Sequence, residues 1–193
     1  MSQLTPEDLY SLEQYAKMRS EFRASVMAHK KNRKVHVGPN ATLYFEDRLT
    51  MQYQVQEMLR IERIFEQDAI AEELAAYNPL IPDGSNWKAT FMVEYPDVEE
   101  RRVALSRLIG IEDKVWVQVE GYDRVFAIAD EDLEREDETK TSSVHFLRFE
   151  LTPEMTSAVK GGAGLSRGID HPNYQHTVSV GEPARGCLAQ DLA

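Results

Sequence analysis

The residues whose types and spacing could best form a functional site lie between Leu43 and Gln67. The apolar spacing of this stretch predicts one long helix. At about 100° per residue, one broad face of this helix is apolar. That face contains Leu49, Met51, Val55, Met58, Leu59 and Phe65. Glu62 falls within the same face, whereas Arg60 and Arg63 lie on a separate polar stripe. A carboxylate out of water must be paired or protonated, so we expect Glu62 to be buried and to meet a partner from another element.

Further polar groups could complete a binding site around this helix. Glu57 lies about 140° from Glu62 on an ideal helix, which is too far apart for both to hold one metal ion. The alternative for both glutamates is structural, as ion pairs with neighbouring arginines or as a dimer contact. The connection at 78–86 contains a Pro-Asp-Gly turn that either presents polar groups or only fixes the chain direction. The expected ligand-binding residues are Glu57, Glu62, Arg63, Asp83, Asn86 and His145.

A metal site is an alternative at the C-terminal stretch 168–176. Asp170, His171 and His176 bring a carboxylate and two imidazoles into one short segment. Imidazole and carboxylate are common metal ligands and general bases. The spacing is irregular and Pro172 interrupts it, so solvated or structural histidines are the competing interpretation. We expect no cofactor held by this chain.

Composition excludes several classes of function. The 193 residues are 42% hydrophobic and carry a net charge of −11, with a pI near 4.9. This charge argues against nucleic-acid binding, which needs cations that neutralise phosphates. No apolar run approaches the roughly 20 residues of a membrane span, and the N-terminus lacks a signal-peptide pattern. We therefore expect a cytoplasmic protein with one domain, mainly helical over 1–77 and mainly sheet over 78–193.

Catalytic motifs of high specificity are missing from the sequence. Cys187 is the single cysteine, so the chain alone cannot build a disulfide or a thiolate metal cluster. There is no Gly-x-Ser-x-Gly elbow, no phosphate-binding glycine loop, and no Glu-x-x-His pair of the kind that di-iron proteins use. Whether the protein is an enzyme stays open.

The pattern of elements predicts an α+β fold. A start signal at Thr5, repeated by Ser11 with Gln14, predicts a helix over about 6–30 that ends in a basic run, Lys30 to Lys34. The run either complements the helix dipole or meets an acidic partner or a phosphate. We expect long N-terminal helices on a mostly antiparallel sheet of about five strands, with two further helices covering one side of it. The strands are expected at 88–95, 114–120, 124–129, 143–151 and 176–180, with a short one at 34–37. The two further helices are expected at 97–108 and 153–160, and a solvated acidic segment at 130–138.

Several long phrases carry a resemblance to a known family. They are FEDRLTMQYQVQEMLRIERIFE, NPLIPDGSNWKATFMVEYPDVEERR, IGIEDKVWVQVEG, TSSVHFLRFELT and IDHPNYQH. In these phrases the chain resembles the uncharacterised bacterial family named domain of unknown function 3501, from about Leu4 to Ala193. The family has no assigned activity. Its members often occur beside a rubrerythrin-like protein and a heterodisulfide-reductase-like iron–sulfur protein, so the resemblance implies a role in peroxide or redox defence.

Three functions follow as hypotheses. The first is an accessory protein that binds an iron–sulfur or rubrerythrin-like partner, with any redox centre on the partner. The second is a small-molecule sensor or enzyme with a polar pocket between the long helix and the sheet. The third is a metal-binding module. A homodimer through the long helix is also expected, because its apolar face is wider than one sheet needs.

Overall fold

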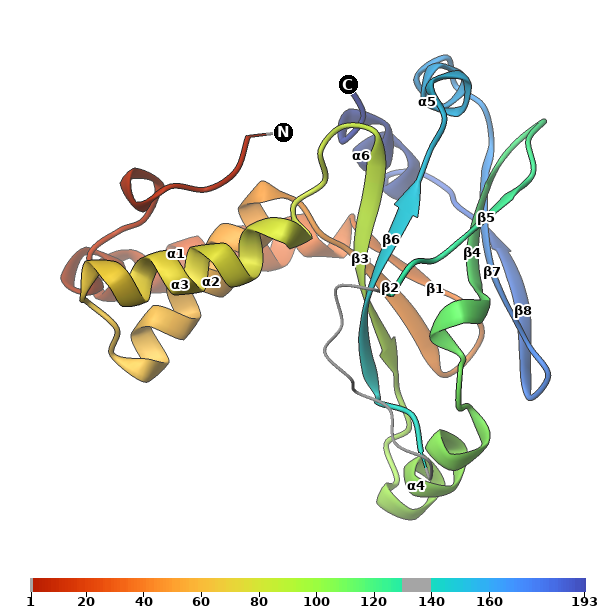
Figure 1. Ribbon diagram of the computed structural model, residues 1–193, viewed down its shortest axis with the longest axis horizontal. Helices are drawn as coiled ribbons and strands as arrows, with labels where there is room; N and C mark the ends of the chain where they lie inside the picture. The colour runs from red at the N-terminus through yellow and green to blue at the C-terminus, as the bar shows by residue number, and fades with distance from the viewer. Residues whose placement is uncertain (1, 130–139) are drawn as a thin grey trace.

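The computed structural model describes residues 2–129 and 140–193, and it shows a sandwich of two sheets with a helical arm at one side (Figure 1). The expected acidic segment at 130–138 lies outside the described residues. The α+β class is confirmed. The sheet prediction needs correction, because the described strands form two antiparallel sheets of four strands each.

Sheet A has the strand order β1-β2-β3-β6 and sheet B the order β5-β4-β7-β8. Sheet A comprises β1 (Lys34–His36), β2 (Ala41–Phe45), β3 (Asn86–Val93) and β6 (Val144–Glu150). Sheet B comprises β4 (Val115–Val119), β5 (Arg124–Phe126), β7 (Leu165–His171) and β8 (Tyr174–Ser179). The turn 121–123 joins β4 to β5 as a hairpin, as its sequence predicts.

The main core lies between the two sheets. Alternate residues of each strand point inward, so β6 buries every second side chain along its length. The largest fully buried side chains include Trp87, Phe91 and Phe149 from sheet A and Ile169 from sheet B. This packing leaves the opposite face of sheet A free to meet the helical arm.

The helical arm contains η1 (Pro6–Asp8), α1 (Leu12–Lys31), α2 (Arg48–Glu62), α3 (Gln67–Tyr77) and η2 (Asn78–Leu80). The Thr5 signal starts only η1, and α1 begins at the second signal, where the Ser11 hydroxyl accepts from the Gln14 N–H at 3.2 Å. A second apolar cluster, separate from the inter-sheet core, holds the arm together. It is centred on Leu4, Met51, Val55, Leu59, Leu74, Leu80 and Ile81.

The predicted helix over 43–67 is wrong at both ends. Its first three residues belong to β2, and α2 begins only after Asp47, whose carboxylate accepts the Thr50 N–H at 2.9 Å. At the other end Arg63 adopts a left-handed conformation with φ 57°, which stops the helix. Phe65 therefore leaves the apolar face and is 71% exposed.

The remaining helices lie at the two ends of the sandwich (Figure 1). They are α4 (Val98–Arg107), η3 (Glu112–Lys114), α5 (Pro153–Lys160) and α6 (Ala184–Gln190). α5 buries Met155 and Val159, but α4 buries no residue, so the expectation that both helices cover one sheet face is wrong. Among residues 2–129 and 140–193, no helix is both long and apolar enough for a membrane crossing.

Candidate functional site

The expectation of a buried carboxylate at Glu62 is wrong. Glu62 is the last residue of α2 and is exposed, as is Arg63 next to it. The sequence wheel placed it in the apolar face because the wheel assumed a helix continuing to 67. Since the chain turns into α3 after Arg63, the last turn of α2 is open to solvent, and no polar site is built there.

Glu57 has a structural role in the described part of the molecule. It bridges α1 and α2, because its Oε1 accepts from Tyr15 Oη at 2.6 Å and from Arg19 Nε at 2.7 Å. Arg60 adds a contact at 3.3 Å from the same helix. The hydrogen bond from Arg19 is the main reason that the pKa of Glu57 falls to about 2. This is the structural alternative that the sequence left open.

Acid titration should expose the contribution of Glu57. Its pKa is lower in the folded than in the unfolded chain, so its stabilisation is complete above about pH 4.5 and is lost as the pH falls towards 2. Compared with Glu57→Gln, we expect the native protein to lose about 1–2 kcal/mol of unfolding free energy over this range, a value reduced for solvent screening at Arg19. Urea unfolding at several pH values measures it. Glu62→Gln is the control, and an equal pH effect in both variants would contradict the assignment.

Asp83, Asn86 and His145 also serve local structure. Asp83 accepts the Ser85 N–H at 2.8 Å, and its own N–H donates to Asn86 Oδ1 at 3.2 Å, so the two residues close the turn before β3. His145 is 2% exposed and contacts Thr141 Oγ1 and the Ser142 carbonyl, each at 3.1 Å. The structure does not gather the six predicted ligand-binding residues around one cavity.

The alternative metal site is not assembled. Asp170 accepts from Arg124 Nη1 at 2.5 Å and from Trp116 Nε1 at 3.1 Å. His171 uses both ring nitrogens, with Nε2 3.1 Å from the Ile109 carbonyl and Nδ1 accepting the Asn173 N–H at 3.2 Å, whereas His176 is exposed on β8. Neighbouring residues of a strand point to opposite faces, so this segment cannot converge on one ion. No metal-binding group of three ligands occurs in the described ranges.

The structure instead places a pocket of about 520 Å³ between the helical arm and the outer face of sheet A. We call it the helix–sheet pocket. Its floor consists of alternate side chains on three adjacent strands, because residues two apart share a face. Tyr44 stands opposite Thr90 and Thr90 opposite Phe146, so the three form one row across the sheet. The floor is completed by Glu46, Met92 and Val144.

The arm supplies the walls of the helix–sheet pocket. The apolar wall residues are Met27 from α1, Met51 from α2, Tyr77 from α3 and Leu80 from η2, with Gln54 beside them. Three lysines, Lys30, Lys31 and Lys34, line the pocket where α1 passes into β1, and we call them the rim lysines. The pocket thus combines an apolar body with one cationic end.

Glu46 is the buried polar group on the pocket floor. It follows β2 and is 4% exposed. Its Oε1 accepts from the Thr90 hydroxyl at 2.7 Å, but its Oε2 has no hydrogen-bond partner within the described residues. A buried acceptor without a donor costs stability. Glu46 therefore lines the pocket with a carboxylate of which one oxygen is left unsatisfied by the described residues.

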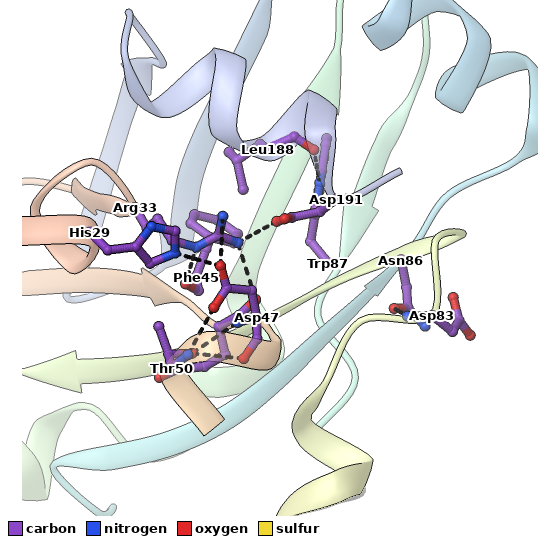
Figure 2. Close-up of polar contacts among 11 residues, drawn as sticks. His29, Arg33, Phe45, Asp47, Thr50, Asp83, Asn86, Trp87, Leu188 and Asp191 are labelled. Atoms are coloured by element: carbon purple, nitrogen blue, oxygen red, sulfur yellow. Dashed lines mark hydrogen bonds and ion pairs between the residues drawn. The ribbon is translucent and has the colours of Figure 1, made fainter. Parts of the chain in front are cut away.

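A buried ion network centred on Arg33 fixes the backbone at Glu46. Figure 2 shows Arg33 with its partners Asp47 and Asp191. Arg33 is 3% exposed and donates to the Phe45 carbonyl at 3.0 Å and to the Glu46 carbonyl at 3.2 Å. Its guanidinium also contacts Asp47 at 3.4 Å and donates to Asp191 from the C-terminal segment. We call Arg33, Asp47 and Asp191, together with His29, the Arg33 network.

The two carboxylates of the Arg33 network titrate differently. Burial raises the pKa of Asp191 to about 6, although Arg33 opposes the rise. Burial also acts on Asp47, but Arg33, the Thr50 N–H and His29, whose Nε2 lies 2.6 Å away, together hold the pKa of Asp47 below its ordinary value. The network therefore joins α1, the start of α2 and the C-terminal end into one rigid support beside the pocket.

Sequence reasoning placed a pocket between the long helix and the sheet but named other residues. Thr90 and Met92 fall in the expected strand 88–95 and Met51 on the expected apolar helix face, but no sequence pattern marks them as pocket residues. Glu46 is absent from the predicted site because the apolar spacing predicts a helix where β2 lies. The available signal was Asp47 with Thr50, a reciprocal helix cap that would have ended the strand at Phe45. The alternation of Tyr44 with Glu46 would then have put both on one sheet face.

Comparison with known proteins finds a family and a solved structure, neither with an assigned activity. The family model described as "Protein of unknown function (DUF3501)" matches residues 3–192. A crystal structure titled as a novel protein of unknown function from Burkholderia pseudomallei K96243 is similar over 100% of both chains, with 51% identity and a TM-score of 0.94. No curated protein matches.

Proposed function

The chain belongs to the DUF3501 family of proteins of unknown function, and we propose that it binds a small organic molecule in the helix–sheet pocket. The observation that carries the proposal is the unsatisfied Oε2 of Glu46 at the floor of a mostly apolar cavity. A mostly apolar pocket with a few convergent polar groups is the usual form of a ligand site.

The size and lining of the pocket support this function. Its volume of about 520 Å³ lies within the range of small-molecule sites. Met27, Met51 and Met92 line three sides of it. Thioether side chains are flexible and polarizable, so they adapt to an apolar ligand better than branched side chains do. If this interface served only to pack the arm onto the sheet, the protein would be more stable with the three methionine side chains filling the cavity. The open cavity therefore favours a binding role.

An apolar fluorescent amine tests the proposal. We expect the purified protein to bind N-phenyl-2-naphthylamine at one site, measured by calorimetry and fluorescence titration. Met92→Trp should weaken this binding about tenfold or more, because the larger ring occupies the pocket. Met58→Trp is the control, since Met58 is partly buried on α2 outside the pocket. Absence of binding, or equal binding by both variants, would rule the proposal out.

Three expectations stay predictions: an iron–sulfur or rubrerythrin-like partner, a redox role and a homodimer. Ile61 and Phe65 are exposed at the end of the helical arm, at 61% and 71%. These two side chains are where a second copy would dock if the dimer prediction holds. Sedimentation of the native protein and of an Ile61→Asp variant measures this directly.

A further inference from the structure

The rim lysines give the helix–sheet pocket a charged end. Lys30 and Lys31 lie in the last turn of α1, and Lys34 begins β1. None of the three ammonium groups forms an ion pair with the residues that the structure describes. Cations in a last helical turn complement the helix dipole, but Lys34 lies beyond the helix and gains nothing from it. Three unpaired cations at one pocket, in a chain of net charge −11, favour an anionic occupant.

The pocket floor carries a second recognition group of opposite kind. Glu46 Oε2 is buried and can only accept a hydrogen bond while the carboxylate is ionised. The Thr90 hydroxyl, at 2.7 Å, already fixes the orientation of the carboxylate through Oε1. A ligand must therefore bring a hydroxyl or an amine N–H to this oxygen, since an ether or a hydrocarbon would leave it unsatisfied.

The rest of the pocket lining is mostly apolar. The flexible side chains of Met27, Met51 and Met92 and the rings of Tyr44, Tyr77 and Phe146 belong to it. Such a lining disfavours binding of a hydrophilic anion such as a free sugar phosphate, because the hydroxyl groups of the sugar would lose their hydrogen bonds to water without gaining partners.

We propose that the helix–sheet pocket binds an amphipathic organic anion. Its carboxylate, phosphate or sulfonate lies against the rim lysines, its hydrocarbon or aromatic body fills the apolar space, and its hydroxyl or amine donates to Glu46 Oε2. This inference rests on the proposed function and adds the chemical class of the ligand.

Two probes with one skeleton test the anionic end. 6-Anilinonaphthalene-2-sulfonate carries the aromatic amine of N-phenyl-2-naphthylamine together with a sulfonate at the opposite end of the ring system, so its N–H is free to donate. We expect the sulfonate to bind the native protein about tenfold more tightly at low salt and to lose this advantage as salt rises. Replacing the three rim lysines with alanine should weaken the sulfonate about tenfold and change the neutral probe less than twofold.

Matched controls separate a local effect from a change of net charge. Alanine at the three exposed lysines Lys17, Lys114 and Lys160 removes the same charge away from the pocket and should leave both affinities within twofold. Because the sulfonate also binds loosely packed states, each variant must show cooperative unfolding and one-to-one stoichiometry.

Two substitutions test the role of Glu46: one removes the acceptor oxygen and the other keeps it. Glu46→Met should weaken both probes about tenfold, since both donate an N–H, whereas Glu46→Gln keeps an acceptor oxygen and should retain more of the affinity. Equal or tighter binding of both probes by Glu46→Met would overturn this part of the inference.

The outcomes distinguish the two proposals. If the neutral probe binds in the pocket and the sulfonate gains nothing from the rim lysines, the anionic class is wrong and the pocket still binds a small molecule. If neither probe binds in the pocket, the proposed function itself fails. If the sulfonate alone depends on the rim lysines and both probes depend on Glu46, both proposals stand.

Discussion

Replacing Arg33 with methionine is expected to destabilise the protein by about 3–5 kcal/mol. The substitution keeps the apolar stem of the side chain but leaves Asp47 and Asp191 buried without their cation. It also removes the donors to the carbonyls of Phe45 and Glu46. Breaking a buried pair on one side costs more than the pair contributes, because the remaining charge stays out of water. Urea unfolding at pH 7 measures the change.

A double-mutant cycle identifies the source of that loss. Asp191→Asn removes one of the carboxylates, so Arg33→Met should cost less in its presence than in the native chain. Arg23→Met, at an exposed position of α1, is the control and should change the unfolding free energy by less than about 0.5 kcal/mol. Strictly additive effects of Arg33→Met and Asp191→Asn would show that the two groups are not coupled.

The sequence predicts the fold best where local signals are strong and agree. The capping signal at Ser11 and the hairpin at 121–123 both occur in the structure, because each depends on neighbouring residues alone. β7 was missed because Gly168 and the charged Arg167 and Asp170 hide its alternation. The absent side chain of Gly168 makes room for the Trp116 ring, a tertiary contact that no local pattern reveals.

The candidate site was predictable in position and not in composition. A pocket between helix and sheet follows from the expected layers, but its polar group depends on where β2 ends. Because α2 begins at Arg48 and not at Leu43, Glu46 lies on a sheet face; because α2 ends at Glu62 and not at Gln67, Glu62 lies in solvent. The Arg33 network joins residues 158 positions apart, so only the folded chain brings them together.

Two buried arginines in this molecule show how partners decide the role of a charge. Arg33 has carboxylates and carbonyls around it, whereas Arg167 on β7 is fully buried and none of its three nitrogens has a hydrogen-bond partner within the described residues. Arg167 lies between aromatic rings, with its guanidinium carbon 4.7 Å from the centroid of Phe45 and 4.6 Å from that of Trp87. Burial lowers the pKa of Arg167 to about 9.

Arg167→Met is therefore expected to stabilise the protein, by about 1–3 kcal/mol at pH 7. The change removes the cost of an unpaired buried charge and loses a cation–π contribution of about 2 kcal/mol, while methionine keeps most of the packing between the rings. Thermal and urea unfolding measure the effect. Arg124→Met is the matched control, because Arg124 stacks on Trp116 at 4.0 Å but is half exposed and paired with Asp170.

The pH dependence of the Arg167→Met variant provides a second measurement with a defined sign. The pKa of Arg167 is lower in the folded than in the unfolded chain, so above about pH 9 the unfolded state binds more protons and native stability gains from rising pH. The difference in unfolding free energy between Arg167→Met and the native protein should therefore become smaller above this pH. A destabilised Arg167→Met variant would instead mean that an anion or ordered water satisfies the guanidinium between the sheets, because only a partnered charge is costly to remove.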